Sequence, residues 1–431
     1  MGDLGFRYRS IRHVLGVAVR RVVPPQTWDL LQGARRRFRT VQAQFRIPHY
    51  PGMPLLSIVV ASHNTENYLG EALKSLIRQQ WSHIEIIIVD DGSTDRTADV
   101  AAQFTGSTIR LIRQSHRGPG AARNVGASLA KGKYLAFFDS DDIADPFFYR
   151  QAIFGLEKTH SDFAVGSYGT LIDSKLCLPP PYIQVLHRSS RRGVVLSQVP
   201  EVMTNALMCT RVYRRDFYER AVAPQPEGVF FEDQLLTMRA FVRARGFDIL
   251  HQPALQWRRR ETKDTTTQQA GEAHNLRERV RAYKETADFL LNEGRPEIRV
   301  ARLAQILATD QLTLTRLSTA SEEYFDIARQ FLEWAIAEVG QETYAEQVDV
   351  QDRVLQAVVM RMNLEAAQSF LEADGRNLKP WVFRSDSQGL LAWLPGWQLD
   401  QSADVPLSTR RVGRRQAEQI PPEAILAGGA H

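Results

Sequence analysis

Three carboxylates within four positions give the sequence its most suggestive chemistry. Asp139, Asp141 and Asp142 directly follow the apolar run Tyr134–Phe138. Carboxylates packed this closely repel one another, and the repulsion raises the pKa of at least one unless a cation joins the group. A hard divalent ion, Mg²⁺ or Mn²⁺, would bridge one or two of them to substrate phosphates. The alternative is an acidic turn that caps the next helix, which accounts for Asp142 better than for Asp139 and Asp141.

A second acidic motif, Asp90–Asp95, reads Asp-Asp-Gly-Ser-Thr-Asp and also ends an apolar run. A carboxylate at this position can accept a hydrogen bond from the imide N–H of a nucleobase. Asp and Gly are also frequent at strand-to-helix turns because they suit the backbone of the turn. Taken alone, the motif indicates either a turn or a base-binding site.

Two further motifs combine charge with an expected helix start. Gly118–Asn124 contains small residues that let the backbone approach a ligand, and Arg123, a fixed cation that can meet a phosphate or sugar hydroxyls. A surface salt bridge is an equal alternative for Arg123. Glu232 and Asp233 begin a helical pattern, where the helix dipole stabilises carboxylates as anions. That placement is also the commonest structural use of acidic residues.

The elements that must position these motifs alternate in type from residue 55 onward. The expected strands are 55–61, 84–89, 108–112 and 134–138, and the expected helices between them are 67–79, 93–104 and 120–130. Ser93 would cap the second of these helices. Nearly all-apolar strands that alternate with helices predict a parallel sheet covered on both faces, which binds ligands at the carboxyl ends of its strands. The acidic motifs lie at those ends.

After about residue 265 the pattern becomes mainly helical. Helical spacing recurs at 272–291, 299–317, 321–339 and 350–371. We therefore expect four parts, namely a basic N-terminal arm at 1–50, an α/β domain at 51–264, a mainly helical domain at 265–400 and a polar tail at 401–431.

Charge and composition exclude several classes of protein. The 431 residues carry a net charge of +5, but residues 1–50 hold ten arginines against two aspartates, so the rest of the chain is slightly acidic. The arm has few interleaved aromatics, and we expect no nucleic-acid binding. The two cysteines, Cys177 and Cys209, provide neither a disulfide framework nor metal-site spacing. No apolar run approaches the ~20 residues that span a bilayer, which predicts a cytoplasmic protein.

The arm carries two apolar stripes at helical spacing, one on each side of Pro24-Pro25, and arginines occupy much of the remaining faces. Basic amphipathic helices lie on anionic membrane surfaces. Residues 1–46 would then hold the protein on the inner face of the plasma membrane, beside a lipid-linked acceptor. The alternative is that the stripes pack on the catalytic core or on a partner chain. The stripes are Ile11, Val14, Leu15, Ala18 and Val22, and Leu31, Ala34, Phe38, Val41 and Phe45.

In order and spacing the motifs resemble the family 2 glycosyltransferases, which have the GT-A fold, over about half of the chain. The family's features are an opening strand with a nucleotide loop, a base-binding turn, a Gly…Ala-Arg-Asn-x-Gly helix start, a DxD metal motif, a basic strand segment and a Glu-Asp pair. Here they correspond to Ser57–Asn64, Asp90–Asp95, Gly118–Gly126, Asp139–Asp141, Thr210–Arg214 and Glu232–Asp233. Three positions depart from the usual pattern, since Ala61 replaces Pro, His63 replaces Tyr and His116 replaces Asn.

The resemblance implies a Rossmann-like α/β domain and a single inverting displacement at the anomeric carbon of a nucleotide-sugar, with a UDP-sugar as the expected donor. Asp139 and Asp141 would hold Mn²⁺ or Mg²⁺, which assists departure of the diphosphate. Asp233, next to Glu232, would take the proton from the acceptor hydroxyl as general base. The residues implied in donor binding are Ala61, His63, Asn64, Glu66, Asp91, His116, Arg123, Asp139, Ser140 and Arg258.

The acceptor implied by the resemblance is a hydroxyl of a cell-surface polysaccharide, a teichoic-acid-like polymer or a glycolipid. The donor sugar, the linkage, the oligomeric state and the role of the helical domain stay open. One alternative function is nucleotidyl transfer, but residues 57–67 lack the Gly-rich loop with a basic residue that this chemistry requires. Another is an inactive nucleotide-sugar-binding protein, against which the intact Asp139, Asp141 and Asp233 argue.

Overall fold

The structure is a computed structural model, and it describes residues 52–172, 175–260, 269–309, 316–372, 382–393, 407–418, 420 and 425–426. The predicted membrane-binding arm at 1–50 lies outside these residues, as do parts of the polar tail. The chain divides into two compact units between residues 261 and 262, and each unit is described by itself.

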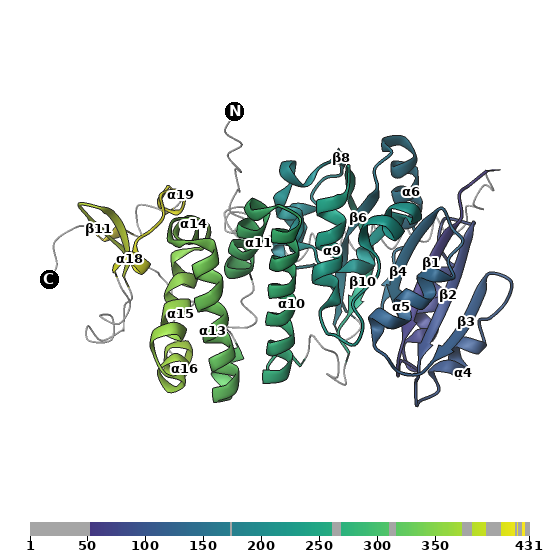
Figure 1. Ribbon diagram of the computed structural model, residues 1–431, viewed down its shortest axis with the longest axis horizontal. Coiled ribbons are helices and arrows are strands. Elements are labelled where there is room, and N and C mark those ends of the chain that lie inside the picture. Colours follow the sequence, from purple (N-terminus) through teal and green to yellow (C-terminus); the bar gives the residue numbers. More distant parts are fainter. Residues whose placement is uncertain are drawn as a thin grey trace. The chain divides into compact units, whose positions relative to one another are not determined.

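The first unit is built on a ten-stranded sheet in the order β3-β2-β1-β4-β9-β6-β10-β5, with β7 beside β6 and β8 beside β10. One half of the sheet is parallel. It consists of β1 (Leu56–Ser62), β2 (Ile84–Asp91), β3 (Ile109–Gln114) and β4 (Tyr134–Asp139). The four strands that the sequence predicts are therefore confirmed, and so is the Rossmann-like α/β class of this unit (Figure 1).

The other half of the sheet is mixed. Strand β9 (Arg211–Arg214) runs antiparallel to both β4 and β6 (Phe163–Ile172), and β6 runs parallel to β10 (Phe247–Arg258). The predicted parallel arrangement holds for the four strands on which it was based, and the sheet as a whole is mixed because β9 reverses direction between two longer strands. The short strands are β5 (Ile143–Ala144), β7 (Lys175–Cys177) and β8 (Arg191–Val194).

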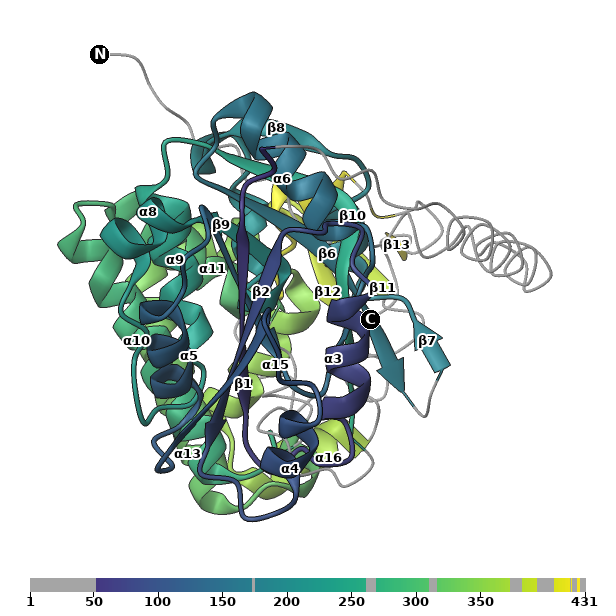
Figure 2. The same ribbon diagram turned by 90° about the vertical axis from the view of Figure 1, so that its right-hand side faces the viewer.

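Helices cover both faces of the parallel half, which explains why its strands are apolar at successive positions. Ile58, Val59 and Val60 are all fully buried. Figure 2 shows α3 (Leu69–Ile77) and α5 (Pro119–Ser128) on opposite sides of β1 and β2. Helix α5 packs so closely that a Cβ at Gly126 would lie 2.2 Å from Val59 Cγ1. Only glycine permits this approach of helix to sheet.

The first of the remaining helical segments of this unit joins β2 to β3, and the others lie between the strands of the mixed half. They are α4 (Thr97–Ala102), α6 (Phe148–Thr159), α7 (Pro181–Leu186), α8 (Arg215–Phe217) and α9 (Glu232–Arg243), with short turns η1 (Leu196–Gln198), η2 (Pro200–Thr204), η3 (Met208–Thr210) and η4 (Tyr218–Val222). Helix α4 begins four residues later than its expected cap, Ser93, and no side chain caps it. The predicted cap is therefore wrong.

The second unit is mainly helical, as the sequence predicts. Its helices are α10 (Ala273–Asn292), α11 (Pro296–Thr309), η5 (Arg316–Thr319), α13 (Glu322–Val339), α14 (Gln341–Gln347), α15 (Val350–Arg361) and α16 (Leu364–Glu372). Ser321 caps α13 by accepting the Tyr324 N–H at 3.2 Å. The helix expected at 350–371 is interrupted between α15 and α16.

A small three-stranded sheet in the order β12-β11-β13 completes the described part of this unit. Its strands are β11 (Val382–Asp386), β12 (Gly389–Trp393) and β13 (Ile425–Leu426), and two short helices accompany them, α18 (Leu407–Arg410) and α19 (Arg414–Ala417). Phe383 and Ala392 belong to the same buried core as Leu332 and Val358 of the helices. The sheet therefore packs on the helical core of its own unit.

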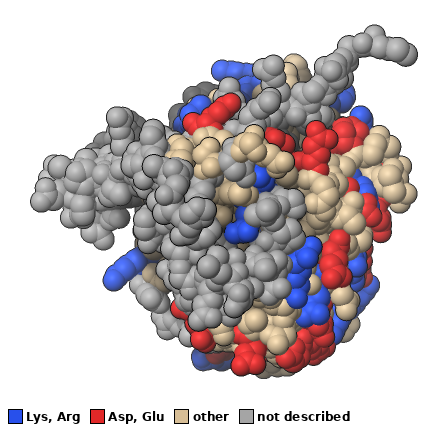
Figure 3. All heavy atoms as spheres, turned by 90° about the vertical axis from the view of Figure 1, so that its left-hand side faces the viewer, with Lys and Arg blue, Asp and Glu red and all other residues tan. Residues whose placement is uncertain are grey.

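The described surface mixes charges of both signs. Figure 3 shows acidic and basic side chains interspersed on the face in view. Within the described residues, no helix combines the length and apolar character that crossing a membrane requires.

Candidate active site

The predicted site residues converge where the parallel strands end. Ala61, near the end of β1, is in register with Val89 of β2 on one side and with Asp139 of β4 on the other. Because parallel strands place their carboxyl ends at one edge, the loop after β1, the turn after β2 and the acidic turn after β4 meet there. This edge is the candidate active site.

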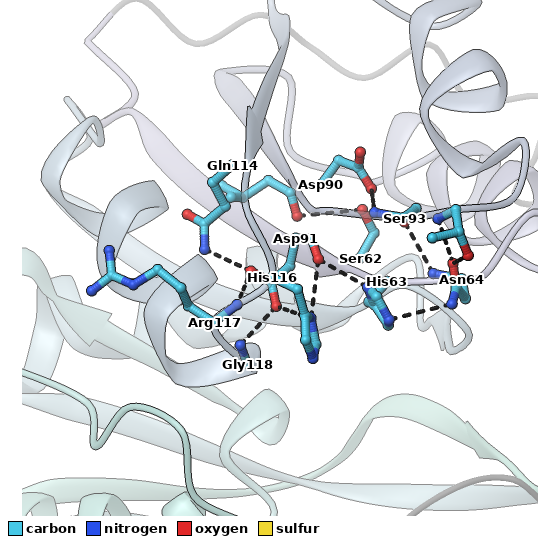
Figure 4. A network of polar contacts seen from close by, with 12 residues as sticks. Ser62, His63, Asn64, Asp90, Asp91, Ser93, Gln114, His116, Arg117 and Gly118 are labelled. Atoms are coloured by element: carbon cyan, nitrogen blue, oxygen red, sulfur yellow. Dashed lines mark hydrogen bonds and ion pairs between the residues drawn. The ribbon is translucent and has the colours of Figure 1, made fainter.

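Asn64 and Glu66, both implied in nucleotide binding, join the loop after β1 to the turn after β2, and Figure 4 shows Asn64 beside Ser93. Asn64 has a left-handed φ of 50°, and its N–H donates to Ser93 Oγ at 3.0 Å while its Oδ1 accepts the Thr94 N–H at 2.9 Å. Glu66 Oε2 accepts the Arg96 N–H at 2.9 Å. Ser93 thus holds this loop instead of capping α4. The contacts of Asn64 and Glu66 with a nucleotide stay a prediction.

Asp91 anchors the segment after β3. Its Oδ1 accepts Gln114 Nε2 at 2.7 Å and the Arg117 N–H at 3.0 Å, and its Oδ2 accepts the Gly118 N–H at 2.8 Å. His116 Nδ1 lies 2.9 Å from the same Oδ2. A carboxylate offers about four acceptor positions, and these donors fill three of them, while the single His116 Nδ1–H also lies near the backbone oxygen of Asp91. An imide N–H of uracil would therefore compete with His116, and the predicted contact of Asp91 with the base remains untested.

Two histidine rings stack beside Asp91 (Figure 4). The His63 and His116 ring centroids lie 4.2 Å apart with an angle of 29° between the planes. Both Nδ1 atoms lie within hydrogen-bond distance of Asp91 O, at 2.9 Å and 3.1 Å. Because a carbonyl oxygen only accepts, each Nδ1 carries a proton. The backbone of Asp91 thus orients an aromatic stack whose His116 side chain is 59% exposed.

A buried arginine joins the acidic turn to the Glu-Asp pair. Arg123 Nη2 donates to Asp139 Oδ1 at 2.7 Å, and Nη1 donates to Glu232 Oε1. The Arg123 side chain is 7% exposed, and such a buried cation is tolerated because it is paired. The surface salt-bridge interpretation of Arg123 is therefore wrong. Its predicted contact with a diphosphate is untested.

Asp233, the predicted base, lies beside this bridge. It differs from the adjacent Glu232, which pairs with Arg123, in its hydrogen bonding. Its Oδ1 is buried without a hydrogen-bond partner. Burial raises the pKa of Asp233 to about 7, and the adjacent Glu232 carboxylate adds to the rise. Arg123 and Arg211 oppose it. A carboxylate with a pKa near neutrality suits a general base.

The backbone that leads into the Glu-Asp pair is held in an unusual conformation. Phe231, the residue before Glu232, has a left-handed φ of 61°, which is rare for a bulky residue. Fully buried Arg211 of β9 places its guanidinium carbon 5.0 Å from the Phe241 ring centroid of α9. By resemblance, Arg211 was predicted only as part of a basic strand segment, Thr210–Arg214.

Arginines from the end of β10 contact the acidic turn. Arg258 donates its N–H to Asp142 Oδ1 at 2.9 Å and its Nε to Asp141 O at 2.7 Å. Arg260 Nε donates to Asp141 Oδ2 at 2.7 Å. Asp142 is therefore not a helix cap, since it fixes the end of β10. Both arginines lie in the basic run Trp257–Arg260, for which the resemblance implies diphosphate and acceptor contacts, and Arg258 alone was predicted as a donor-binding residue.

Burial has the largest effect on the pKa values of the carboxyl groups in the acidic turn. It raises the pKa of Asp141, Arg260 opposes the rise, and the Asp139 charge adds to it. Burial also raises the pKa of Asp142 well above its usual range, with Asp141 and Asp139 adding to the effect. Ser140, between these carboxylates, is buried as well. Ser140 and Asp142 are thus shielded from water, whereas the Asp139 side chain is 30% exposed.

The donor set fits a hard divalent ion only if substrate supplies the remaining ligands. Among the described residues, no three His, Cys, Asp or Glu side chains are grouped so that they could hold a metal ion. Asp139 and Asp141 provide two carboxylates on one turn, each with one oxygen engaged by an arginine. Mg²⁺ and Mn²⁺ are commonly bound by one or two carboxylates together with phosphate oxygens.

Comparisons with known proteins agree with this geometry. Residues 57–220 match the model of glycosyl transferase family 2. "Uncharacterized glycosyltransferase EpsJ" of Bacillus subtilis is 30% identical over 200 residues, which are 44% of this chain and 56% of that protein. "Putative glycosyltransferase EpsH" of the same species is 29% identical over 210 residues, 48% of this chain and 61% of that protein. The chain thus spans somewhat more than half the length of these relatives.

Solved structures show the same fold. S. aureus TarS 1-349 superimposes with a TM-score of 0.59 at 19% identity and covers 80% of this chain and 98% of that one. Its complex with UDP-GlcNAc gives a TM-score of 0.52 at 20% identity with the same coverage. The family match, the named relatives and the shared architecture agree with one another. Residues 57–220 are therefore similar to glycosyl transferase family 2, and the chain has the GT-A-like fold of these solved structures.

Proposed function

We propose that the protein transfers a sugar, with inversion, from a UDP-sugar to a hydroxyl of a cell-surface polysaccharide, a teichoic-acid-like polymer or a glycolipid. One observation carries the proposal. The buried bridge Asp139–Arg123–Glu232 places the acidic turn after β4 next to Asp233, whose pKa lies near 7. A donor held at the turn would therefore present its anomeric carbon near a group able to accept a proton.

The nucleotide would occupy the edge formed by the loop after β1 and the turn after β2. The stacked rings of His63 and His116 offer an aromatic face for the base, and base–aromatic stacking contributes ~1–3 kcal/mol per base in other proteins. The complex of TarS with UDP-GlcNAc supports a UDP-linked donor. The diphosphate would then lie over the acidic turn, within reach of Arg258 and Arg260.

The acidic turn would hold the leaving group through a divalent ion. Asp139 and Asp141 would ligate Mn²⁺ or Mg²⁺, which when bound neutralises charge that develops on the departing diphosphate. Arg260 would have to share Asp141 with the ion or move to the phosphates, because it now pairs with Oδ2. Guanidinium groups bind carboxylate and phosphate with the same fork of N–H donors.

Asp233 would supply the base. As the acceptor oxygen bonds to the anomeric carbon, its proton passes to the carboxylate of Asp233, and the bond from that carbon to the diphosphate breaks with the electron pair leaving on the diphosphate. Burial raises the pKa of Asp233 to about 7, which keeps the carboxylate basic enough for this step. The family match favours glycosyl transfer over nucleotidyl transfer.

The test is a panel of nucleotide-sugars assayed for nucleoside-diphosphate release with and without Mn²⁺. We expect release from at least one UDP-sugar, and loss of release in Asp233→Asn. The proposal is wrong if no donor is cleaved and UDP does not bind. UDP binding without cleavage by any donor, acceptor mixture or metal would instead support the inactive binding protein.

The arm is proposed, from the sequence alone, to hold the enzyme on an anionic membrane. Sedimentation with anionic vesicles at low salt tests it, with a variant lacking residues 1–46 as control. Equal binding by both proteins, or by neither, would leave packing on the protein as the role of the arm.

A further inference from the structure

One asparagine on α5 makes a complete set of hydrogen bonds to the loop that leads into α9. We call this loop, residues 225–231, the base loop. Asn124 Oδ1 accepts the Gln225 N–H at 2.9 Å, and Asn124 Nδ2 donates to Gln225 O and to Glu227 Oε1, both at 3.0 Å. The side-chain amide therefore uses its acceptor and its donors on residues about a hundred positions away in the chain.

The same helix lies so close to the base loop that only glycine fits at the point of contact. A Cβ at Gly120 would lie 1.9 Å from Pro226 O. Arg117, just before α5, donates Nη2 to Glu227 Oε2 at 2.5 Å. Close backbone packing and two side chains of this segment thus fix the first half of the base loop.

Helix α5 also touches both functional ends of the site. At its start, the Gly118 N–H donates to Asp91 Oδ2 at 2.8 Å in the nucleotide turn. In its middle, Arg123 pairs with Glu232, the neighbour of Asp233. An unbroken set of contacts therefore runs from the nucleotide turn through α5 to the Glu-Asp pair.

Asp233 depends on this support because its own side chain is weakly tethered. Its Oδ1 makes no hydrogen bond. The position of the carboxylate must then be set by the backbone that carries it, which is the first turn of α9 and the base loop before it. A side chain without a fixing hydrogen bond can still be well placed if its backbone is rigid.

We propose that α5 is the positioning element of the general base, with Asn124 and Glu227 as positioning residues that hold Asp233 at the distance that transfer requires. The proposal rests on the proposed function, because it assumes that Asp233 is the base. In this proposal the segment Gly118–Asn124 has two functions. Besides facing the donor, the segment ties the donor half of the site to the base loop.

The experiment compares three variants with the wild-type protein. Asn124→Ala removes all three contacts to the base loop. Asn124→Asp keeps the acceptor for the Gln225 N–H but turns an oxygen toward Gln225 O and Glu227. Ser128→Ala is the matched control, because Ser128 is exposed on the same helix and its hydroxyl donates only to Val125 O.

Three quantities are measured for each protein: UDP release from UDP-N-acetylglucosamine or whichever UDP-sugar the donor panel identifies, the Kd for UDP, and amide hydrogen exchange of residues 225–231. We expect Asn124→Ala to lower kcat about tenfold to a hundredfold, the scale of a misplacement of about 1 Å. The Kd for UDP should stay unchanged, and exchange in the base loop should accelerate. Ser128→Ala should match the wild type in all three.

A second-site change separates positioning from general damage. Asn124→Asp places a carboxylate against Glu227, and Glu227→Gln in the same protein supplies an amide that can donate to it. Part of the rate lost in Asn124→Asp should return in the double variant. Independent defects would instead add, and the double variant would be slower than either single one.

The outcomes for the two proposals can be told apart. Absence of UDP release from the wild-type protein overturns the proposed function. Unchanged exchange of residues 225–231 in Asn124→Ala overturns the positioning role whether or not the protein turns over. So does a wild-type kcat in that variant. A variant that loses UDP affinity as much as kcat would place Asn124 in donor binding and would also overturn the role.

Discussion

Two aspartates of the site, Asp91 and Asp233, have opposite surroundings. Both lie in a motif at the border of a strand or helix, and both have neighbouring carboxylates in the sequence. Asp91 accepts hydrogen bonds at both oxygens from the segment after β3. Asp233 has a buried oxygen with no partner.

The difference indicates which carboxylate is available for chemistry. A carboxylate that accepts hydrogen bonds at both oxygens holds its donors in place. A buried carboxylate with an empty position is held at a free-energy cost, and its affinity for a proton rises. Asp91 is therefore expected to matter mainly for the shape of the nucleotide turn, and Asp233 mainly for the rate.

The largest effect is expected for Asp233→Asn. The amide has nearly the same shape but cannot take a proton, so kcat should fall about 10²–10⁴-fold, the usual contribution of a general base. The Kd for UDP should not change, which isothermal titration calorimetry measures. The free energy of unfolding should stay the same or rise, because a buried ionisable oxygen is replaced by a neutral group. A near-normal kcat would move the base to Glu232 or elsewhere.

The pH dependence of the rate follows from the same group. Asp233 accepts a proton only when ionised, and its pKa is about 7, so kcat should increase with pH and level off above about 7. Glu232 raises this pKa, whereas Arg123, Arg211 and Asp139 are the other charges that act on it. Glu232→Gln removes one negative neighbour, so the rise in kcat should move to lower pH. If kcat of Glu232→Gln rises at the same pH as kcat of the wild-type protein, a group other than Asp233 controls the pH dependence.

Asp141→Ala should abolish the metal-dependent part of UDP-sugar binding. The turn would lose one of its two candidate ligands, and Arg260 would lose its partner. Calorimetry with and without Mn²⁺ measures the effect, and chelation of the metal from the wild-type protein should reproduce it. Tm serves as the control for folding. If UDP-sugar and Mn²⁺ bind to the variant as before, the metal assignment is wrong.

Asp91→Ala should lower stability more than it lowers kcat. The N–H groups of Arg117 and Gly118 would lose their acceptor, and a hydrogen bond to a charged group contributes about 1.5–3 kcal/mol. Urea denaturation measures the free energy of unfolding. Asp233→Asn is the matched comparison, because it changes the other carboxylate without removing a hydrogen bond. If both variants lose the same free energy of unfolding, Asp91 and Asp233 do not differ in their structural role.

The parallel half of the fold, and the meeting of the acidic motifs at one edge of its sheet, were predictable because both depend on local patterns. Strand runs that are apolar at every position identify β1 to β4, and motifs at their ends meet because parallel strands share an edge. The mixed half carries no such signal, since the four-residue strand β9 lies between β4 and β6 through contacts that no local pattern reveals.

The partners of individual side chains were not predictable for the same reason. Ser93 suits a helix cap by its type, but the N–H that it accepts belongs to Asn64, 29 positions earlier. Arg123 bridges carboxylates that are 16 and 109 positions away. Residue type and spacing indicate that such a group needs a partner, whereas the tertiary structure decides which partner it has.

The smallest effect is expected at the stacked rings of the nucleotide edge. His116→Asn keeps a side-chain N–H that can donate to Asp91 and removes the exposed ring. The free energy of unfolding should therefore stay the same, while UDP should bind about tenfold more weakly, a change of ~1.4 kcal/mol and within the range for base stacking. Pyrophosphate lacks a base, so it should bind to the variant and the wild-type protein equally. If UDP affinity is unchanged, the base lies away from the rings. If the affinity for pyrophosphate falls as much as the affinity for UDP, His116 acts on the phosphates. The hydrogen-bonded turn around Asp91 would then contribute to diphosphate binding as well as to the shape of the nucleotide site.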